Sequence, residues 1–165
     1  DARAAAAWTQ EVLTEDSAEF LRTLPSEARV DSFTLAHGSP RQPVWEYILD
    51  PRTAAANFNE FQTDYCAVGH SHLPLVFQRS SADAFALSRQ VAGDQVVALS
   101  PRMILNPGSV GQPRDMDPRA AYAILDLQTR SWESRRAAYD IGDVQLRMLK
   151  AGLPERQALR LVAGW

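Results

Sequence analysis

The chain has little cysteine, no long apolar run and little net charge, and each of these shortages excludes a class of protein. One cysteine in 165 residues leaves no internal disulfide, which is typical of a protein in a reducing cytoplasm. No apolar run approaches the length of about 18 residues that a membrane-spanning helix needs, so no membrane partner is expected. The net charge of −3 gives no electrostatic footprint for duplex nucleic acid.

The rest of the composition is that of an ordinary globular domain. Hydrophobic residues make up 45% of the chain and charged residues 22%, and 165 residues are enough for one domain with a genuine core. Cys66 lies inside the apolar run Tyr65–Val68, so we expect a buried structural thiol rather than a reactive one.

Helices and strands are predicted along the whole chain from hydrophobic period, capping residues and turn residues. Helices are expected over residues 1–13, 18–23, 51–61, 141–150 and 154–162. Strands are expected over residues 30–35, 65–68, 73–77, 84–91, 95–99, 102–105, 122–127 and 131–136, with turns at 80–83 and 92–94. In the hairpin near the end, Tyr122, Ile124 and Leu127 are candidates for the inward face. Trp45 and Tyr47 are expected to pack in the core, the alternative being that one of them walls a substrate pocket.

The chain has only three histidines, and each follows an apolar, strand-like run beside a glycine or one residue from it. His37 follows residues 33–36, and His70 and His72 follow residues 65–68. On extended backbone His70 and His72 would face the same side, with Cβ atoms about 6.5 Å apart. Since ligands in open α/β sheets bind beyond the carboxyl ends of strands, we expect the three to share one metal site. The alternative is that His70 and His72 only hydrogen-bond to nearby backbone in a turn.

Several motifs occur together in an order that is specific although each alone is weak. They are His37-Gly38, Gly69-His70-Ser71-His72, Asn106-Pro107-Gly108-Ser109-Val110-Gly111-Gln112-Pro113-Arg114-Asp115, Tyr139-Asp140 and Ala151-Gly152-Leu153-Pro154. With them, the sequence from about residue 33 onward resembles the calcineurin-like metallophosphoesterases. The most similar branch is the compact bacterial and archaeal one, described as phosphodiesterases or as diadenosine-tetraphosphatase-like.

The resemblance implies an α/β fold, part of a four-layer α/β/β/α sandwich. The family's earlier motifs, Asp-x-His, Gly-Asp-x-x-Asp and Gly-Asn-His-Asp, do not occur here. Residues 1–165 are therefore expected to be the C-terminal part of a single metallophosphoesterase domain, lacking its N-terminal strands. The catalytic groups would lie in the upstream segment of the same protein, which is the expected partner, and the isolated chain is expected to be inactive.

The resemblance also implies a site with two divalent metal ions, which can be Mn, Fe, Zn, Ni or Co. His37 and His70 would bind one ion and His72 the other. Asn106, Gly108, Ser109 and Arg114 would contact the substrate, a phosphorylated small molecule or nucleotide.

Taken alone, the segment around Pro107-Gly108 could be a plain tight turn. Arg114 and Asp115 are expected to form an internal ion pair, the alternative being that Arg114 meets substrate phosphate. Arg135 and Arg136 are expected on a solvated strand edge.

The implied function is metal-dependent hydrolysis of phosphate esters, as a phosphodiesterase, phosphatase or nucleotide pyrophosphatase. The alternative is a non-catalytic scaffold on the same fold, like the retromer subunit. All three histidines favour the enzyme, because a scaffold has no need of neutral imidazoles at these loops.

Overall fold

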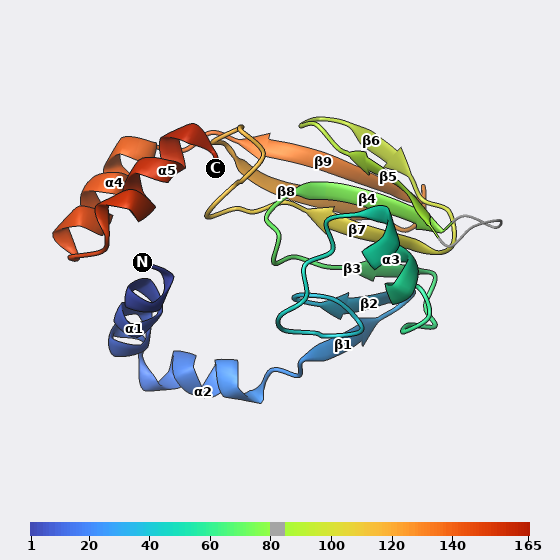
Figure 1. The fold of residues 1–165 in the computed structure, drawn as a ribbon, viewed down its shortest axis with the longest axis horizontal. Helices are drawn as coiled ribbons and strands as arrows, with labels where there is room; N and C mark the ends of the chain where they lie inside the picture. The colour runs from blue at the N-terminus through green and yellow to red at the C-terminus, as the bar shows by residue number, and fades with distance from the viewer. Residues whose placement is uncertain (80–84) are drawn as a thin grey trace.

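The structure is a computed structural model and describes residues 1–79 and 85–165 (Figure 1). Its helices are α1 (Ala2–Val12), α2 (Glu15–Thr23), α3 (Pro51–Asn57), α4 (Ile141–Lys150) and α5 (Glu155–Ala163). Its strands are β1 (Glu27–Val30), β2 (Phe33–Ala36), β3 (Tyr65–Ala67), β4 (Pro74–Arg79), β5 (Ala86–Gln90), β6 (Val96–Ala98), β7 (Met103–Pro107), β8 (Ala120–Asp126) and β9 (Ser131–Ala137). No helix within the described ranges is both long and apolar enough to cross a membrane.

The strands form two sheets. The larger has the order β1-β2-β3-β7-β4-β5, with β2, β3 and β7 parallel to one another, and the smaller is antiparallel with the order β6-β9-β8. Figure 1 shows α3 against the larger sheet, while α1 with α2 and α4 with α5 project from one end of the sheets as two helical arms. The predicted α/β class is confirmed, and the complete four-layer sandwich stays a prediction.

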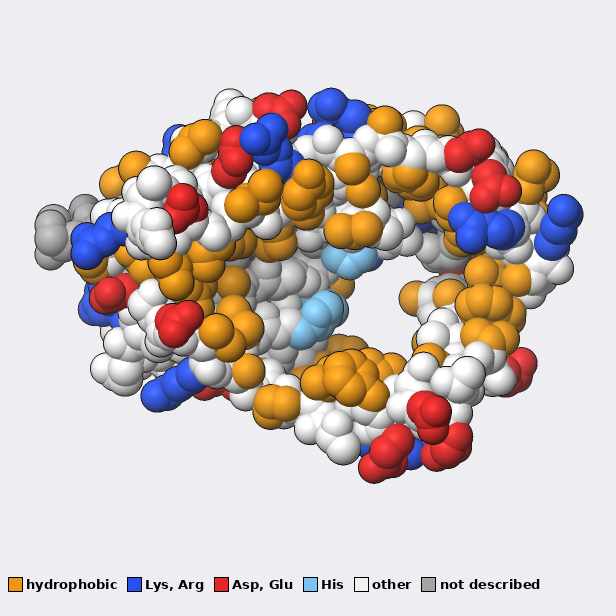
Figure 2. Space-filling view, turned by 180° about the vertical axis from the view of Figure 1, so that it is seen from behind, with side chains coloured by type: hydrophobic (Ala, Val, Ile, Leu, Met, Phe, Trp, Pro, Cys, Tyr) orange, Lys and Arg blue, Asp and Glu red, His pale blue; other side chains and the backbone are white. Residues whose placement is uncertain are grey.

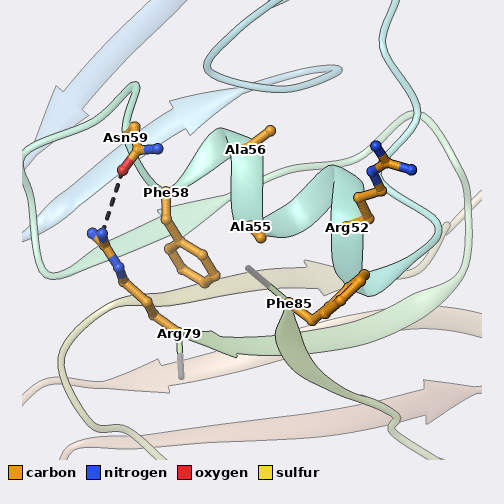
Figure 3. A pocket seen from close by; sticks show the side chains of 7 residues that line it. All are labelled: Arg52, Ala55, Ala56, Phe58, Asn59, Arg79 and Phe85. Atoms are coloured by element: carbon orange, nitrogen blue, oxygen red, sulfur yellow. Dashed lines mark hydrogen bonds between the residues drawn. The ribbon is translucent and has the colours of Figure 1, made fainter. Parts of the chain in front are cut away.

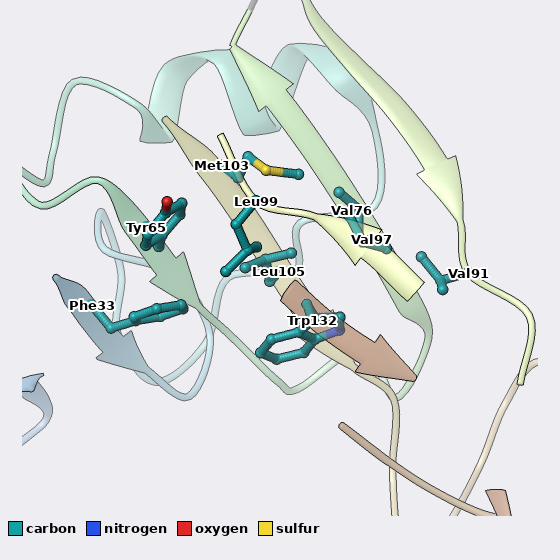
Figure 4. Packing of buried hydrophobic residues seen from close by; sticks show 9 residues of the cluster. All are labelled: Phe33, Tyr65, Val76, Val91, Val97, Leu99, Met103, Leu105 and Trp132. Carbon is teal, nitrogen blue, oxygen red and sulfur yellow. The ribbon is translucent and has the colours of Figure 1, made fainter. Parts of the chain in front are cut away.

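Side-chain alternation along the strands divides the core into two clusters. On one face of the larger sheet the side chains meet those of the smaller sheet (Figure 4), and they are Phe33, Tyr65, Val76, Val91, Val97, Leu99, Met103, Leu105 and Trp132. On the other face the strands pack against α3 through Ile48, Ala54, Phe58, Phe61, Cys66, Val68, Phe77, Ala86 and Ile104. Each fully buried large side chain of this kind stabilises the fold by about 1.5–3 kcal/mol.

The single strand predicted over residues 30–35 is wrong, because the chain reverses there. Strands β1 and β2 pair antiparallel with Val30 opposite Phe33, so only Asp31 and Ser32 connect them. Asp31 has a φ of 50°, a left-handed conformation that aspartate tolerates better than most residues. The turn residue was hidden between two apolar stretches that together looked like one strand.

Two predicted helix boundaries are also wrong. Helix α2 begins at Glu15, because the Thr14 hydroxyl accepts a hydrogen bond from the Ser17 amide at 3.2 Å and caps it. Helix α3 ends at Asn57 rather than at residue 61. Beyond it, the Arg102 guanidinium donates to the carbonyls of residues 58, 61 and 63, and these bonds fix the chain in a non-helical path. Helix α4 has the predicted bounds.

The predicted inward face of β8 is wrong. Tyr122 and Ile124 are 40% and 48% exposed, and Leu127 beyond the strand is 44% exposed. Ala121 and Ala123 take the inward positions instead. A small residue is required at position 121, because Gly108 approaches so closely that a Cβ added to this glycine would lie 2.8 Å from the Ala121 Cβ. The turn predicted at 80–83, and the first residue of the strand predicted from 84, lie outside the described residues.

Candidate metal centre

Three neighbouring parallel strands end at the same edge of the larger sheet. Strand β2 ends one residue before His37, β3 leads through residues 68 and 69 to His70 and His72, and β7 ends at Asn106-Pro107. Because parallel strands share their carboxyl ends, the loops that follow them lie side by side at the place where open α/β sheets bind ligands. Figure 2 shows histidine side chains on the wall of an opening through the molecule, with hydrophobic side chains around it.

The rings of His37 and His70 meet at this edge. The Nε2 atom of His37 lies 2.9 Å from the Nδ1 atom of His70, within the distance of about 5 Å that a shared ion requires. Two ligand nitrogens with metal bonds of about 2.0–2.1 Å lie about 3.0–3.4 Å apart on one ion, so the pair already has nearly the spacing of two ligands.

Residues 69–72 form the loop that bears His70 and His72, here called the histidine loop. Its backbone is not extended, so the prediction that both histidines lie on extended backbone is wrong. His70 and His72 have φ values of 57° and 61°, both in the left-handed region, and the Ser71 amide donates to the Gly69 carbonyl at 2.6 Å. The Gly69 amide donates in turn to the His37 carbonyl at 2.9 Å, which joins this loop to the end of β2. Left-handed residues other than glycine cost energy and persist where the surrounding structure holds them.

The side chain of Asn106 holds the backbone of the histidine loop in this conformation. Its Nδ2 atom donates to the Gly69 carbonyl at 2.7 Å and to the Ser71 hydroxyl at 2.9 Å, and its Oδ1 atom accepts from the Gly108 amide at 2.9 Å. The residue is only 2% exposed. Its predicted contact with substrate stays a prediction, whereas its bonds to the histidine loop are a feature of the structure.

His72 is oriented by a backbone carbonyl. Its Nδ1 atom lies 2.7 Å from the Gln112 oxygen, and a carbonyl can only accept, so Nδ1 carries the proton and Nε2 keeps its lone pair. Metal-binding histidines are commonly held in this way by a hydrogen bond from the other ring nitrogen. His72 therefore fits the role of a metal ligand.

The surroundings of His70 and His72 lower the pKa of both imidazoles and so favour their neutral form. Burial lowers the pKa of His70, and the charges of His37 and Arg114 lower it further. Burial also lowers the pKa of His72, with smaller contributions from Arg114, His37 and His70, although its hydrogen bond to Gln112 acts in the opposite direction. Neutral imidazole is the form that binds metal.

The loop after β7 supports His72. Gly108 has a φ of 89°, which favours glycine. The Ser109 hydroxyl accepts from the Gln112 amide at 3.0 Å, and the Gln112 side chain accepts from Arg114 at 2.9 Å. The segment is a tight turn that also fixes the carbonyl beside His72. Substrate contacts of Gly108, Ser109 and Arg114 stay predictions.

The predicted ion pair between Arg114 and Asp115 is wrong. Asp115 pairs instead with Arg136, and the two side chains are 5% and 1% exposed. The predicted solvated edge is also wrong, because β9 is the middle strand of its sheet. On the same strand, Arg135 pairs with Glu133 at 2.6 Å. Arg114 is left beside the histidines, where its charge can act on a ligand.

Tyr47 is expected from the sequence to pack in the core, with a place in the wall of a substrate pocket only as the alternative, and the structure places it against His70. Its ring stacks on His70 with centroids 4.0 Å apart and planes at 29°. Tyr47 is 43% exposed and Trp45 is 77% exposed, so the prediction that they pack in the core is wrong for both. The next residue, Ile48, is buried with 3% exposed. No local signal could have found the stack, because it depends on how the loop after His37 folds back.

Carboxylates do not join the histidines in the part of the chain that the structure describes. Within residues 1–79 and 85–165, no three or more His, Cys, Asp or Glu side chains form a group that could hold an ion. Asp115 would be a candidate carboxylate ligand from its place in the sequence, but its side chain forms an ion pair with Arg136. The residues present thus fit part of a divalent-metal site, as neutral nitrogen ligands.

A separate pocket of about 360 Å³ lies beside α3 (Figure 3). It is lined by Arg52, Ala55, Ala56, Phe58, Asn59, Arg79 and Phe85. In its wall the Arg79 guanidinium donates a hydrogen bond to the Asn59 side chain at 3.3 Å. Its described lining residues include no histidine and no carboxylate. It shares no residue with the histidine site.

Known proteins resemble this chain over most of its length. The family model for the calcineurin-like phosphoesterase superfamily domain matches residues 8–130. The chain belongs to the calcineurin-like phosphoesterase superfamily. A metallophosphoesterase from Sphaerobacter thermophilus has a crystal structure that superposes with a TM-score of 0.93, at 42% identity over 98% of this chain and 66% of its own.

Two further similar proteins come from archaea. The uncharacterised protein MJ0912 of Methanocaldococcus jannaschii is 33% identical over 162 residues, which are 95% of this chain and 63% of that protein. The hypothetical protein PH1004 of Pyrococcus horikoshii shares the fold, with a TM-score of 0.73 at 22% identity over 95% of this chain and 57% of its own. The chain spans less than two thirds of the length of each of these three proteins.

Proposed function

We propose that this chain supplies the histidine ligands of a two-metal site that hydrolyses phosphate esters. The observation that carries the proposal is the pair of ring nitrogens of His37 and His70, 2.9 Å apart at the carboxyl ends of parallel strands. His37 and His70 would hold one divalent ion and His72 the other, and Mn, Fe, Zn, Ni or Co suits imidazole ligands. When bound, such ions activate a water molecule and stabilise charge on the phosphoryl oxygens.

The chain's own residues prepare the site for an anionic ester. Asn106 fixes the loop that bears His70 and His72, and Gln112 fixes the tautomer of His72. The Arg114 guanidinium, held by Gln112, adds a positive charge that would attract a phosphate. The substrate is a phosphorylated small molecule or a nucleotide.

An upstream segment of the same protein would complete the domain, supplying carboxylates and the catalytic groups. An apolar cavity of about 240 Å³ between the two sheets supports this, lined by Val30, Asp31, Phe33, Leu35, Ala67, Leu125, Leu127 and Trp132. Four of these side chains, Val30, Leu35, Leu125 and Leu127, are 37–54% exposed, and proteins rarely leave such a contiguous apolar surface uncovered. The greater length of the relatives fits such a segment.

The test is hydrolysis of bis-(p-nitrophenyl) phosphate by the complete protein with Mn²⁺. Replacing His70 by Ala should lower kcat/KM by at least about a hundredfold, since the ion both activates water and stabilises charge. Gln128→Ala, in the exposed turn between β8 and β9, is the matched control and should retain the wild-type rate. A His70→Ala protein that keeps its fold and its rate in excess Mn²⁺ would contradict the proposal.

A second measurement addresses the upstream segment. Residues 1–165 alone should hydrolyse no ester, and adding the purified upstream segment should restore Mn²⁺-dependent hydrolysis. If the complete protein neither binds Mn²⁺ nor hydrolyses any phosphate ester, the scaffold alternative replaces the enzyme.

A further inference from the structure

A well-braced loop, residues 38–47, connects His37 to the aromatic residue stacked on His70. Its centre is the Glu46 carboxylate, whose side chain is only 11% exposed. Glu46 accepts hydrogen bonds from the Ser39 hydroxyl at 2.6 Å, from the Asn57 side chain at 2.8 Å and from the Arg41 guanidinium. A charged group this well paired fixes the loop in one conformation.

The start of the loop is equally constrained. The Gly38 amide donates to the Pro43 carbonyl at 2.6 Å. A Cβ atom at Gly38 would lie 2.9 Å from the carbonyl oxygens of both Gln42 and Glu46, so only glycine fits where the loop closes on itself. The loop is thus rigid before any ligand arrives, which reduces the entropy that a ligand contact would cost.

Two aromatic side chains flank the buried carboxylate and stay on the surface. Trp45 is 77% exposed and Tyr47 is 43% exposed, while Glu46 between them is turned inward. The Tyr47 ring is stacked on His70, a proposed metal ligand, with centroids 4.0 Å apart. Burial lowers the pKa of His70, and the backbone of Trp45 lies close enough to that imidazole to act on its pKa in the opposite direction, so both residues adjoin the proposed site of chemistry.

We propose that Trp45 and Tyr47 form a stacking subsite for a flat aromatic ring, such as a nucleobase, in the organic part of the ester. The subsite rests on the proposed function, because it selects among substrates of that same site. Aromatic rings stack on tryptophan in offset arrangements, and one such stack contributes about tenfold to a hundredfold in affinity. Arg114 near the same histidines would receive the phosphate while the ring lies on Trp45.

Binding tests the subsite without requiring turnover. Calorimetric titration of the complete, Mn²⁺-loaded protein should give adenosine 5′-monophosphate an affinity at least about tenfold higher than ribose 5-phosphate, which lacks the ring. Trp45→Ala should abolish this preference and Trp45→Phe should keep most of it. Phe85→Ala, which removes an aromatic residue 57% exposed in the separate pocket beside α3, should leave the preference intact. Equal affinities of the wild type for the two ligands would overturn the subsite.

Kinetics separates this inference from the proposed function. The p-nitrophenyl ester of thymidine 5′-monophosphate and methyl p-nitrophenyl phosphate share a leaving group and differ in the ring. In Trp45→Ala the ratio of their kcat/KM values should fall about tenfold. Hydrolysis of both esters with an unchanged ratio would overturn the subsite while leaving the phosphoesterase function standing. If neither ester is hydrolysed, the proposed function fails, and the comparison of adenosine 5′-monophosphate with ribose 5-phosphate alone decides the subsite.

Discussion

The Nε2 atom of His37 lies 2.9 Å from the Nδ1 atom of His70, although 33 residues separate them in the chain. The pair exists because β2 and β3 are adjacent and parallel, so both strands deliver their next residues to one edge. Asn106, from the third parallel strand, then fastens the loop of His70. One amide side chain thereby sets the geometry of two proposed metal ligands.

Asn106→Ala should therefore weaken Mn²⁺ binding by about tenfold to a hundredfold, the usual effect of removing a residue that orients metal ligands. The loss follows because His70 and His72 would relax from their left-handed conformations. Calorimetric titration of the complete protein with Mn²⁺ measures it, with Asn59→Ala, near the separate pocket, as the matched control. Wild-type Mn²⁺ affinity in a folded Asn106→Ala protein would show that the loop needs no such hold.

Local patterns predicted the strand ends but not the contacts between them. Each histidine follows an apolar run that became a parallel strand, β2 or β3, and period and flanking glycine were enough to place it. The left-handed backbone of His70 could not be predicted, since it depends on Asn106, which lies 37 residues beyond its partner Gly69. The stack of Tyr47 on His70 likewise depends on a folded loop.

The error over Arg114 and Asp115 has the same cause. Neighbours of opposite charge in sequence suggested a pair, but the partner of Asp115 is Arg136, 21 residues away on β9. The sequence also contained no clear sign of the turn at Asp31, where one residue with left-handed backbone divides the predicted strand into β1 and β2. The partner of a charged residue and the position of a turn depend on tertiary packing, which the periodicity of the sequence does not encode.

The buried pair of Asp115 and Arg136 gives a stability prediction. Asp115→Asn should lower the free energy of unfolding by about 1.5–3 kcal/mol, because it removes the ionised partner of the buried Arg136 and leaves only Asp117, 3.8 Å away, as its counter-ion. Urea denaturation measures the change. Asp143→Asn is the control, since its ion pair with Arg147 is exposed and should matter by less than about 1 kcal/mol. Equal effects of the two substitutions would refute the distinction between them.

Glu46→Gln should destabilise the loop that presents Trp45, by about 1.5–3 kcal/mol, the range for hydrogen bonds to a buried charged group. Burial acts against ionisation of Glu46, but hydrogen bonds from Arg41, Ser39 and Asn57 outweigh it, so its pKa lies below the ordinary value of 4.5.

The pH dependence follows from that direction. As the pH falls through 4.5, the unfolded state takes up a proton at Glu46 before the folded state does, so the stabilisation is lost on acidification. The difference in unfolding free energy between wild type and Glu46→Gln should therefore be full at pH 7 and shrink below pH 4.5. A difference that is constant with pH would contradict the role of the ionised carboxylate.

Cys66 should be unreactive in the folded protein. It is fully buried, and burial raises the pKa of its thiol from 9.0 to about 12. A colourimetric disulfide reagent at pH 8 should modify it only after unfolding. Above pH 9 the unfolded thiol ionises while the folded one does not, so stability should fall as pH rises through that range, and Cys66→Ala should remove this part of the dependence. Rapid modification of the native protein would contradict the burial.

The most direct test of the metal site is an anomalous difference map from crystals of the complete protein grown with Mn²⁺ and measured near the manganese absorption edge. The proposed site predicts a peak within about 2.5 Å of nitrogen atoms of both His37 and His70, and a second peak beside Nε2 of His72. Peaks elsewhere, or none at the histidines in crystals of protein that hydrolyses phosphate esters with Mn²⁺, would contradict it.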